Sequence, residues 1–163
     1  MYNVIMKRIE TSVQANLRNA KVLIIEDNED QWLLMSQAMQ QCLPEVTPVR
    51  MATPQQAMRL LEVWCYQEWE IPKLILLDLY LPSSEEGWQL LKWIKAMPAS
   101  INLIPIVMFS GSADPVDIEQ SYRAGTAAYV VKPTQFAAWL PLFQELRSFW
   151  WETVTLPPLS LGL

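Results

Sequence analysis

The chain has 163 residues and contains no histidine. This absence excludes a Ser-His-Asp or Cys-His catalytic site, a histidine zinc ligand and a role as a phosphohistidine carrier, because each of them needs an imidazole. Any chemistry must therefore use carboxylates, hydroxyls and lysines. With 52% hydrophobic and 18% charged residues, the chain is long enough for one well-filled core and too short for two ordinary domains.

Three further features are scarce or missing. Cys42 and Cys65 are the only cysteines and form no CxxC motif, which favours a reducing compartment over a disulfide framework. No apolar run has the length of a signal peptide or of a membrane span, so we expect a cytoplasmic protein without membrane contact. The formal charge is −5 and the basic residues are scattered, so we expect no direct nucleic-acid binding.

Short runs rich in leucine or β-branched residues alternate with longer segments of helical apolar spacing. The runs predicted as strands cover residues 21–25, 46–51, 73–78, 104–109 and 127–131. A helix is predicted after each strand, and this order is typical of a doubly wound α/β domain with a five-stranded parallel sheet.

The predicted domain covers residues 21–150, and its last helix runs from residue 134 to about residue 150. A polar extension at 1–20, for which a short helix is one interpretation, precedes the domain, and a tail at 151–163 follows it. Within this tail, we expect the part that starts at Leu156-Pro157-Pro158 to be extended.

Polar residues lie where the predicted strands end, which is where doubly wound parallel sheets bind ligands. They are Glu26 and Asp27 after the first strand, Asp78 after the third, Ser110 after the fourth and Lys132 after the fifth. Three close carboxylates raise one another's pKa unless a hard divalent cation lies between them, and Mg²⁺ prefers such oxygen ligands together with phosphate oxygens. A nearby ammonium can pair with a carboxylate and later with a phosphoryl oxygen, and a hydroxyl completes a phosphate pocket.

Four motifs in this order resemble those of the response-regulator receiver domain, the family of the chemotaxis protein CheY. They are Ile24-Ile25-Glu26-Asp27-Asn28, Leu76-Leu77-Asp78-Leu79-Tyr80-Leu81-Pro82, Phe109-Ser110-Gly111 and Tyr129-Val130-Val131-Lys132-Pro133. The resemblance covers residues 21 to about 150 and implies a flavodoxin/CheY-like (βα)5 fold. Within the family, the segments 121–125 and 149–150 are most similar to the small cyanobacterial phytochrome-associated regulators.

The resemblance implies a single-domain response regulator of a two-component phosphorelay. Its phosphoacceptor would be Asp78, and its phosphodonor would be a sensor histidine kinase, of the phytochrome type if the narrower resemblance holds. Receiver domains catalyse their own phosphorylation and slowly hydrolyse the aspartyl phosphate, but they are otherwise not enzymes. Phosphoryl transfer needs mainly positioning and charge neutralisation, which agrees with this assignment.

The resemblance also implies a Mg²⁺ site. Asp27 and Glu26 would hold the ion directly or through water, together with Asp78 and the backbone carbonyl of Tyr80. Glu26 stands where Asp is commoner, so its longer arm makes direct ligation less secure than that by Asp27. Tyr80 is bulkier than the polar residues often found at its position, and we hypothesise that its side chain shields the acyl phosphate from water.

Three more residues have implied roles in sensing the phosphoryl group. Lys132 would contact it, Ser110 would swing towards it, and Tyr129 would change rotamer in response. Two other function classes stay open at this point: a phosphorylation-independent receiver-like scaffold or dimerisation module, and a Mg²⁺-dependent phosphohydrolase of the haloacid dehalogenase type. The hydrolase class has a second Asp two residues after its nucleophile, where this chain has Tyr80.

The last predicted helix carries more aromatic area than one sheet face requires. Its predicted buried stripe consists of Phe136, Leu140, Phe143 and Leu146 or Arg147. The residues off this stripe or at its margin are Trp139, Leu142 and Trp150. We therefore predict a homodimer through the surface made by the fourth helix, the fifth strand and the fifth helix, with these three residues in the interface. The alternative is a helix that is buried all round or that carries scattered exposed apolar residues.

Overall fold

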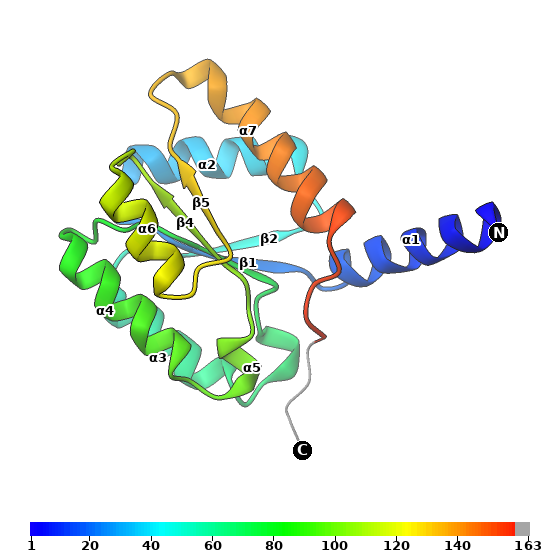
Figure 1. Cartoon of the computed structure of the whole chain (residues 1–163), viewed down its shortest axis with the longest axis horizontal. Coiled ribbons are helices and arrows are strands. Elements are labelled where there is room, and N and C mark those ends of the chain that lie inside the picture. The colour runs from blue at the N-terminus through cyan, green and yellow to red at the C-terminus, as the bar shows by residue number, and fades with distance from the viewer. Residues whose placement is uncertain (159–163) are drawn as a thin grey trace.

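The structure is a computed structural model that describes residues 1–158, and the part of the predicted tail at 159–163 lies outside the described residues. Its centre is a parallel five-stranded sheet in the order β2-β1-β3-β4-β5, which confirms the predicted fold class. The strands are β1 (Lys21–Ile25), β2 (Thr47–Met51), β3 (Leu74–Leu77), β4 (Ile106–Ser110) and β5 (Ala128–Val131). Apart from Lys21, every residue of β1, β3 and β4 is buried, because helices cover both faces of the sheet (Figure 1).

Helices form one layer on each side of the sheet. On one side α2 (Glu29–Cys42) packs with α7 (Trp139–Leu146), and on the other side α3 (Pro54–Trp64) packs with α4 (Ser84–Lys95). The helix α6 (Pro115–Arg123) lies beside β5. These five correspond to the predicted helices, although the last one, predicted from 134 to about 150, is divided into η2 (Phe136–Ala138), α7 and η3 (Arg147–Thr153). The structure adds α1 (Tyr2–Leu17), α5 (Ala99–Asn102) and the short turn η1 (Glu68–Glu70).

The helix α7 corrects the predicted interface. Trp139 and Trp150 are only 5% and 7% exposed, and they belong to the core with Phe143 and Leu146. The reason is the start of the helix: a 3₁₀ turn, η2, comes first, so the buried stripe begins at Trp139 and continues three or four residues apart. The predicted stripe residue Phe136 is instead 73% exposed.

Aromatic contacts explain why this stripe is buried. The Phe109 ring on β4 makes edge-to-face contacts with Trp139 at 5.8 Å and with Phe143 at 6.2 Å between ring centroids. Leu142 is half-buried and packs against the same core. The two tryptophans therefore fill the layer between sheet and helix and cannot form an exposed partner surface.

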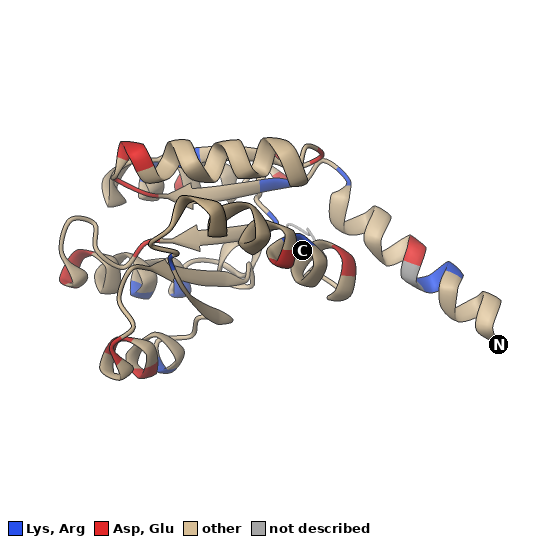
Figure 2. Cartoon of the chain, turned by 90° about the horizontal axis from the view of Figure 1, so that it is seen from above, with Lys and Arg blue, Asp and Glu red and all other residues tan. Residues whose placement is uncertain are grey.

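The N-terminal extension forms the helix α1, in agreement with one interpretation of its sequence. Its last turns dock on the C-terminal part of the chain, whereas its first turns project from the rest of the molecule (Figure 1, Figure 2). Asn16 is 3% exposed and holds the two ends together: its Nδ2 donates to the carbonyls of Trp151 at 3.1 Å and Val154 at 2.6 Å, and its Oδ1 accepts from the N–H of Leu156 at 3.2 Å.

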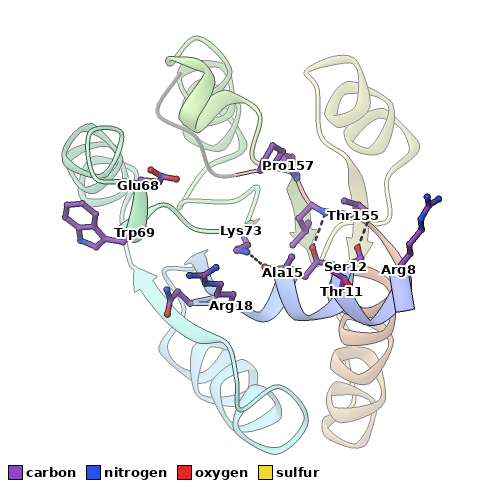
Figure 3. Close-up of a pocket in the computed structure, with 14 residues that line it drawn as sticks. Arg8, Thr11, Ser12, Ala15, Arg18, Glu68, Trp69, Lys73, Thr155 and Pro157 are labelled. Atoms are coloured by element: carbon purple, nitrogen blue, oxygen red, sulfur yellow. Dashed lines mark hydrogen bonds between the residues drawn. The ribbon is translucent and has the colours of Figure 1, made fainter. Parts of the chain in front are cut away.

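The predicted domain boundary at residue 150 is also too early. Trp151 lies within η3 and is 2% exposed, and Leu156 is buried in the same core cluster as α2 and α7. Ser12 and Thr155 share a further hydrogen bond of 3.1 Å between their hydroxyls (Figure 3). Residues up to 156 therefore belong to the folded unit.

The basic residues are scattered in the fold as they are in the sequence, and the cysteines form no CxxC motif or disulfide among the described residues. Lys and Arg are spread over separate elements and form no single basic band among residues 1–158 (Figure 2). Cys42 and Cys65 are both free thiols. Within the described range, no helix combines the length and the apolar character that crossing a membrane requires.

Candidate functional site

Backbone hydrogen bonds fix the positions of the acidic residues and the lysine at the carboxyl edge of the sheet. The N–H of Glu26 donates to the carbonyl of Met51 at 3.1 Å, and that of Asp78 donates to Ile25 at 3.0 Å. On the other side, the N–H of Lys132 donates to the carbonyl of Ser110 at 2.7 Å. The ladder thus extends one residue past each strand, which brings side chains distant in sequence to one place.

A buried lysine joins two of the carboxylates. The ammonium of Lys132 lies 2.5 Å from Glu26 Oε2 and 3.1 Å from Asp78 Oδ2, and it donates to Gln31 Oε1 at 2.5 Å. All three charged side chains are less than a tenth exposed. Three acceptors match the three donors of an ammonium, so this buried charge is fully hydrogen-bonded.

Burial also changes the acidity of the two carboxyl groups. Desolvation raises the pKa of Glu26 and of Asp78, and the attraction of Lys132 opposes this rise in both. The negative charge of Asp78 raises the pKa of Glu26 further, and that of Asp27 raises the pKa of Asp78. The site therefore holds more carboxylate charge than one lysine neutralises.

The three carboxylates could hold a divalent cation. Glu26, Asp27 and Asp78 each offer a carboxylate oxygen within 4.8 Å of the others, and Asp27 is the exposed member. An all-oxygen set open to solvent on one side suits a hard ion that retains water ligands. The sequence-predicted acids are thus brought together, whereas the role of the Tyr80 carbonyl stays a prediction.

Arg50, on β2, positions the acidic loop and was missed from sequence. Its guanidinium donates to the carbonyl of Glu26 at 3.0 Å and to that of Asp27 at 3.4 Å, and its Nη1 lies 2.6 Å from Glu29 Oε2. The loop leads into α2, where the side chain of Asn28 accepts from the N–H of Gln31. Arg50 therefore holds the carbonyls, which leaves the carboxylates of this loop free for the site.

The loop after Asp78 is held by a close approach of α4. A Cβ on Gly87 would lie 1.8 Å from the carbonyl oxygen of Leu79, so only glycine permits this contact. In the same loop the N–H of Tyr80 donates to Asp78 Oδ1 at 3.2 Å. The position of the Asp78 carboxylate thus depends on a helix residue that no motif indicated.

The two predicted switch residues both bind Ser112, which the sequence analysis did not single out. Ser110 is fully buried, and its Oγ accepts from the N–H of Ser112 at 3.2 Å. The hydroxyl of Tyr129, which is half-buried, donates to the carbonyl of Ser112 at 2.9 Å. One loop residue therefore connects the hydroxyl at the site with the tyrosine on β5.

Tyr80 reaches across the site towards α6. Its hydroxyl donates to Asp117 Oδ2 at 2.9 Å, and the hydroxyl of Ser112 donates to the same oxygen at 2.6 Å. The hydrogen bond to Asp117 raises the pKa of the Tyr80 phenol. The Tyr80 side chain is 42% exposed, and its role in shielding the site stays a prediction.

Comparison with known proteins identifies the family. Residues 22–141 match the response regulator receiver domain. The chain belongs to this family. Its fold, the sheet order and the acidic cluster at the carboxyl edge are those that such a receiver would need to accept a phosphoryl group.

Two solved structures are similar over most of the chain. The Mn²⁺-bound form of response regulator Rcp1 has a TM-score of 0.73 and 30% identity, covering 85% of this chain and 99% of that one. The phosphorylated cyanobacterial phytochrome response regulator RcpA has a TM-score of 0.74 and 30% identity, with the same coverage. In sequence, Rcp1 of Synechocystis sp. is 37% identical over 92 residues.

Coverage of the curated relatives is partial. The match spans 56% of this chain and 61% of Synechocystis Rcp1. It spans half of the probable methanogenesis regulatory protein FilR2 of Methanothrix harundinacea, at 29% identity. These comparisons show the family and the receiver domain. The acidic cluster and the Mn²⁺-bound relative suggest a divalent metal site.

Proposed function

We propose that this receiver is a single-domain response regulator that accepts a phosphoryl group on Asp78 from a sensor histidine kinase of the phytochrome type. The observation that carries the proposal is the geometry of Asp78. Its carboxylate pairs with the buried ammonium of Lys132 and lies within 4.8 Å of the carboxylates of Glu26 and Asp27. A nucleophile, a fixed cation and two further metal ligands are thus concentrated at one strand end.

The transfer follows from these positions. A carboxylate oxygen of Asp78 bonds to phosphorus, the phosphorus–nitrogen bond of the phosphohistidine breaks, and its electron pair stays on the imidazole. The product is an acyl phosphate. Asp78 is already a carboxylate, so no general base is needed.

Other residues of the chain neutralise the charge of the phosphoryl group and orient it. Asp27 and Glu26 would hold Mg²⁺ with Asp78, and the bound ion would supply positive charge to the phosphoryl oxygens. Lys132 exchanges its contact with Asp78, 3.1 Å long, for a phosphoryl oxygen, while Glu26 and Gln31 keep its position. The lysine therefore remains paired before and after transfer.

The switch residues give the output. When the Ser110 hydroxyl turns to a phosphoryl oxygen, it gives up its bond from the N–H of Ser112. Ser112 then shifts, and Tyr129 loses its partner carbonyl. The change in phosphorylation would thus reach the surface of α6 and β5.

That surface is the proposed homodimer interface, with a revised set of residues. Trp139 and Trp150 are buried, but Tyr122 on α6 is 51% exposed and Val131 on the edge strand β5 is 43% exposed. β5 pairs only with β4 among the described strands, so it lies at an edge of the sheet, where the hydroxyl of Tyr122 accepts from the N–H of Tyr129 at 3.2 Å. The fourth-helix, fifth-strand and fifth-helix surface therefore stays the proposal, here made of α6, β5 and α7.

The partner and cofactor proposals are supported by relatives. RcpA is described as a phosphorylated cyanobacterial phytochrome response regulator, and Rcp1 as Mn²⁺-bound. At 30% identity over 85% of this chain, these relatives favour a phytochrome-type kinase and a divalent ion, for which Mg²⁺ is our choice.

Incubation with acetyl phosphate and Mg²⁺ tests the proposal. The wild-type chain should gain one phosphoryl group in intact-mass measurements, and neither Asp78→Asn nor the wild type in EDTA should gain it. Asp30→Asn is a matched control, because Asp30 is an exposed acid in the first turn of α2 outside the acidic cluster. Absence of an Asp78-dependent adduct would instead favour the phosphorylation-independent scaffold.

A further inference from the structure

A cavity of about 890 Å³ lies at the opposite edge of the sheet from Asp78. Its walls are α1, the segment 155–158 and the turn η1 (Figure 3). This volume falls in the range of sites for small molecules and cofactors. The cavity shares no residue with the acidic cluster, so the proposed phosphorylation leaves it unexplained.

The charge of the cavity is opposite to that of the chain. Arg8, Arg18 and Lys73 line it, with Glu68 as its one carboxylate, although the whole chain has a formal charge of −5. None of the three cations forms an ion pair with a carboxylate among residues 1–158. Lys7, Arg59, Lys92 and Lys95 also lack such a pair among the described residues, so what distinguishes the three cations is that they line one cavity.

Two of the cations repel each other. Lys73 is half-buried, and both its burial and the nearby charge of Arg18 lower its pKa. One of its N–H groups donates to the carbonyl of Ala15 at 2.5 Å, near the C-terminus of α1 (Figure 3). That bond uses one of the three ammonium donors. An anion beside Lys73 and Arg18 would accept hydrogen bonds from both and remove their repulsion.

The rest of the lining is apolar or neutral. Trp69 is 65% exposed, and Pro157 and Pro158 add apolar surface. Arg8 lies on α1, and Arg18 follows the last residue of that helix. The ten positions between them correspond to about 15 Å by helical rise, so the site is elongated. An aromatic residue and three cations in one lining suit a ligand with a planar ring joined to several negative charges.

We propose that this cavity binds a nucleoside polyphosphate. The phosphates would lie against Arg18 and Lys73, with Arg8 further along α1, and the base would use the Trp69 end. Glu68 at that end can accept hydrogen bonds from amino or hydroxyl groups of the base or sugar. Binding there would link α1 to the segment that follows η3.

Isothermal titration with ATP and GTP in EDTA tests the proposal, because EDTA prevents metal-dependent phosphate binding at the acidic cluster. We expect saturable binding that weakens with added salt and exceeds that of pyrophosphate, which lacks the ring. Arg18→Gln should weaken affinity about tenfold, since it removes a charge-assisted hydrogen bond. Lys7→Gln is the matched control: Lys7 is exposed on the same helix and does not line the cavity.

The outcomes separate this site from the proposed function. Asp78→Asn should bind nucleotide as the wild type does, whether or not Asp78 accepts phosphate. The proposal is overturned if no saturable binding occurs, or if Lys7→Gln and Arg18→Gln weaken it equally. It is also overturned if pyrophosphate binds as tightly as ATP, or if an acidic peptide binds at Arg18 in place of nucleotide.

Discussion

At the residue scale, the buried carboxylate of Asp78 lowers the stability of the fold at the position that carries the proposed reactivity. Burial is the largest influence on its carboxyl group and raises its pKa, and Glu26 adds a second buried negative charge beside the same lysine. A carboxylate in this position is therefore less stable in the folded chain than in water. A neutral residue of the same shape would remove that cost and also the reactivity.

We predict that Asp78→Asn raises the free energy of unfolding at neutral pH in EDTA, because burial raises the pKa of Asp78 and so disfavours its charged form. Lys132 keeps Glu26 and Gln31 as partners, so the substitution leaves no unpaired lysine. A carboxyl group whose pKa is higher in the folded state stabilises the fold at low pH, and this contribution is lost as pH rises through the folded pKa. The advantage of Asn should therefore shrink on acidification.

Urea unfolding of wild type and Asp78→Asn across the acidic range measures this difference. Asp30→Asn, which alters an exposed acid, should leave the stability almost unchanged. A less stable Asp78→Asn at neutral pH would mean that the attraction of Lys132 outweighs burial.

Tyr80 should lengthen the lifetime of the aspartyl phosphate, because it lies two residues after Asp78 and its hydroxyl is bound to Asp117, which would keep the ring near the acyl phosphate. Tyr80→Asn should speed dephosphorylation several-fold, since water gains access to the acyl phosphate. Tyr80→Phe keeps the ring and loses only the 2.9 Å bond, so its effect should be smaller. Decay of the phosphorylated form after donor removal gives both rates, and equal lifetimes in all three proteins would reject the shielding role.

The sequence could predict that the acids, Lys132 and Ser110 lie at one edge of the sheet. The ends of the strands follow from the apolar runs, and parallel strands bring their carboxyl ends to the same edge. It could not predict Arg50, Ser112 or Asp117. Their hydrogen bonds join elements that are distant in the chain, and no local spacing encodes such contacts. Gly87 was missed for the same reason, since its role depends on how α4 meets the loop of Leu79.

At the element scale, the two ends of the chain complete the fold. The prediction treated them as an extension and a tail because residues 1–20 are polar and prolines follow Leu156. Burial of Trp151 and Leu156 depends on α1 packing against η3, a tertiary contact that periodicity does not report. The predicted buried stripe of α7 was wrong for a similar reason. A 3₁₀ turn precedes the helix, so the buried stripe starts at Trp139 and not at Phe136.

Asn16→Ala should therefore lower the free energy of unfolding by about 2 to 3 kcal/mol, because it leaves buried backbone groups of Trp151, Val154 and Leu156 without their partner. Gln14→Ala, at an exposed position on the same helix, should have little effect. Chemical denaturation of the two variants provides the comparison. If Asn16→Ala left the free energy of unfolding unchanged, the two ends of the chain would not be part of the folded unit.

At the scale of the whole molecule, we predict a homodimer through α6, β5 and α7. Tyr122→Asp places a charge on this surface and should shift sedimentation at micromolar concentration towards the monomer. Tyr66→Asp is the control, because Tyr66 is 79% exposed but follows α3 on another side of the sheet. A wild-type chain that is monomeric both with and without beryllofluoride would remove the dimer proposal.

The central claim is that Asp78 carries the phosphoryl group. Borohydride reduction after acetyl phosphate treatment converts an aspartyl phosphate into homoserine, which peptide mass mapping can locate. We predict Mg²⁺-dependent conversion at Asp78 alone. Conversion at Asp27, or at no residue while the chain remains folded and binds Mg²⁺, would contradict the account.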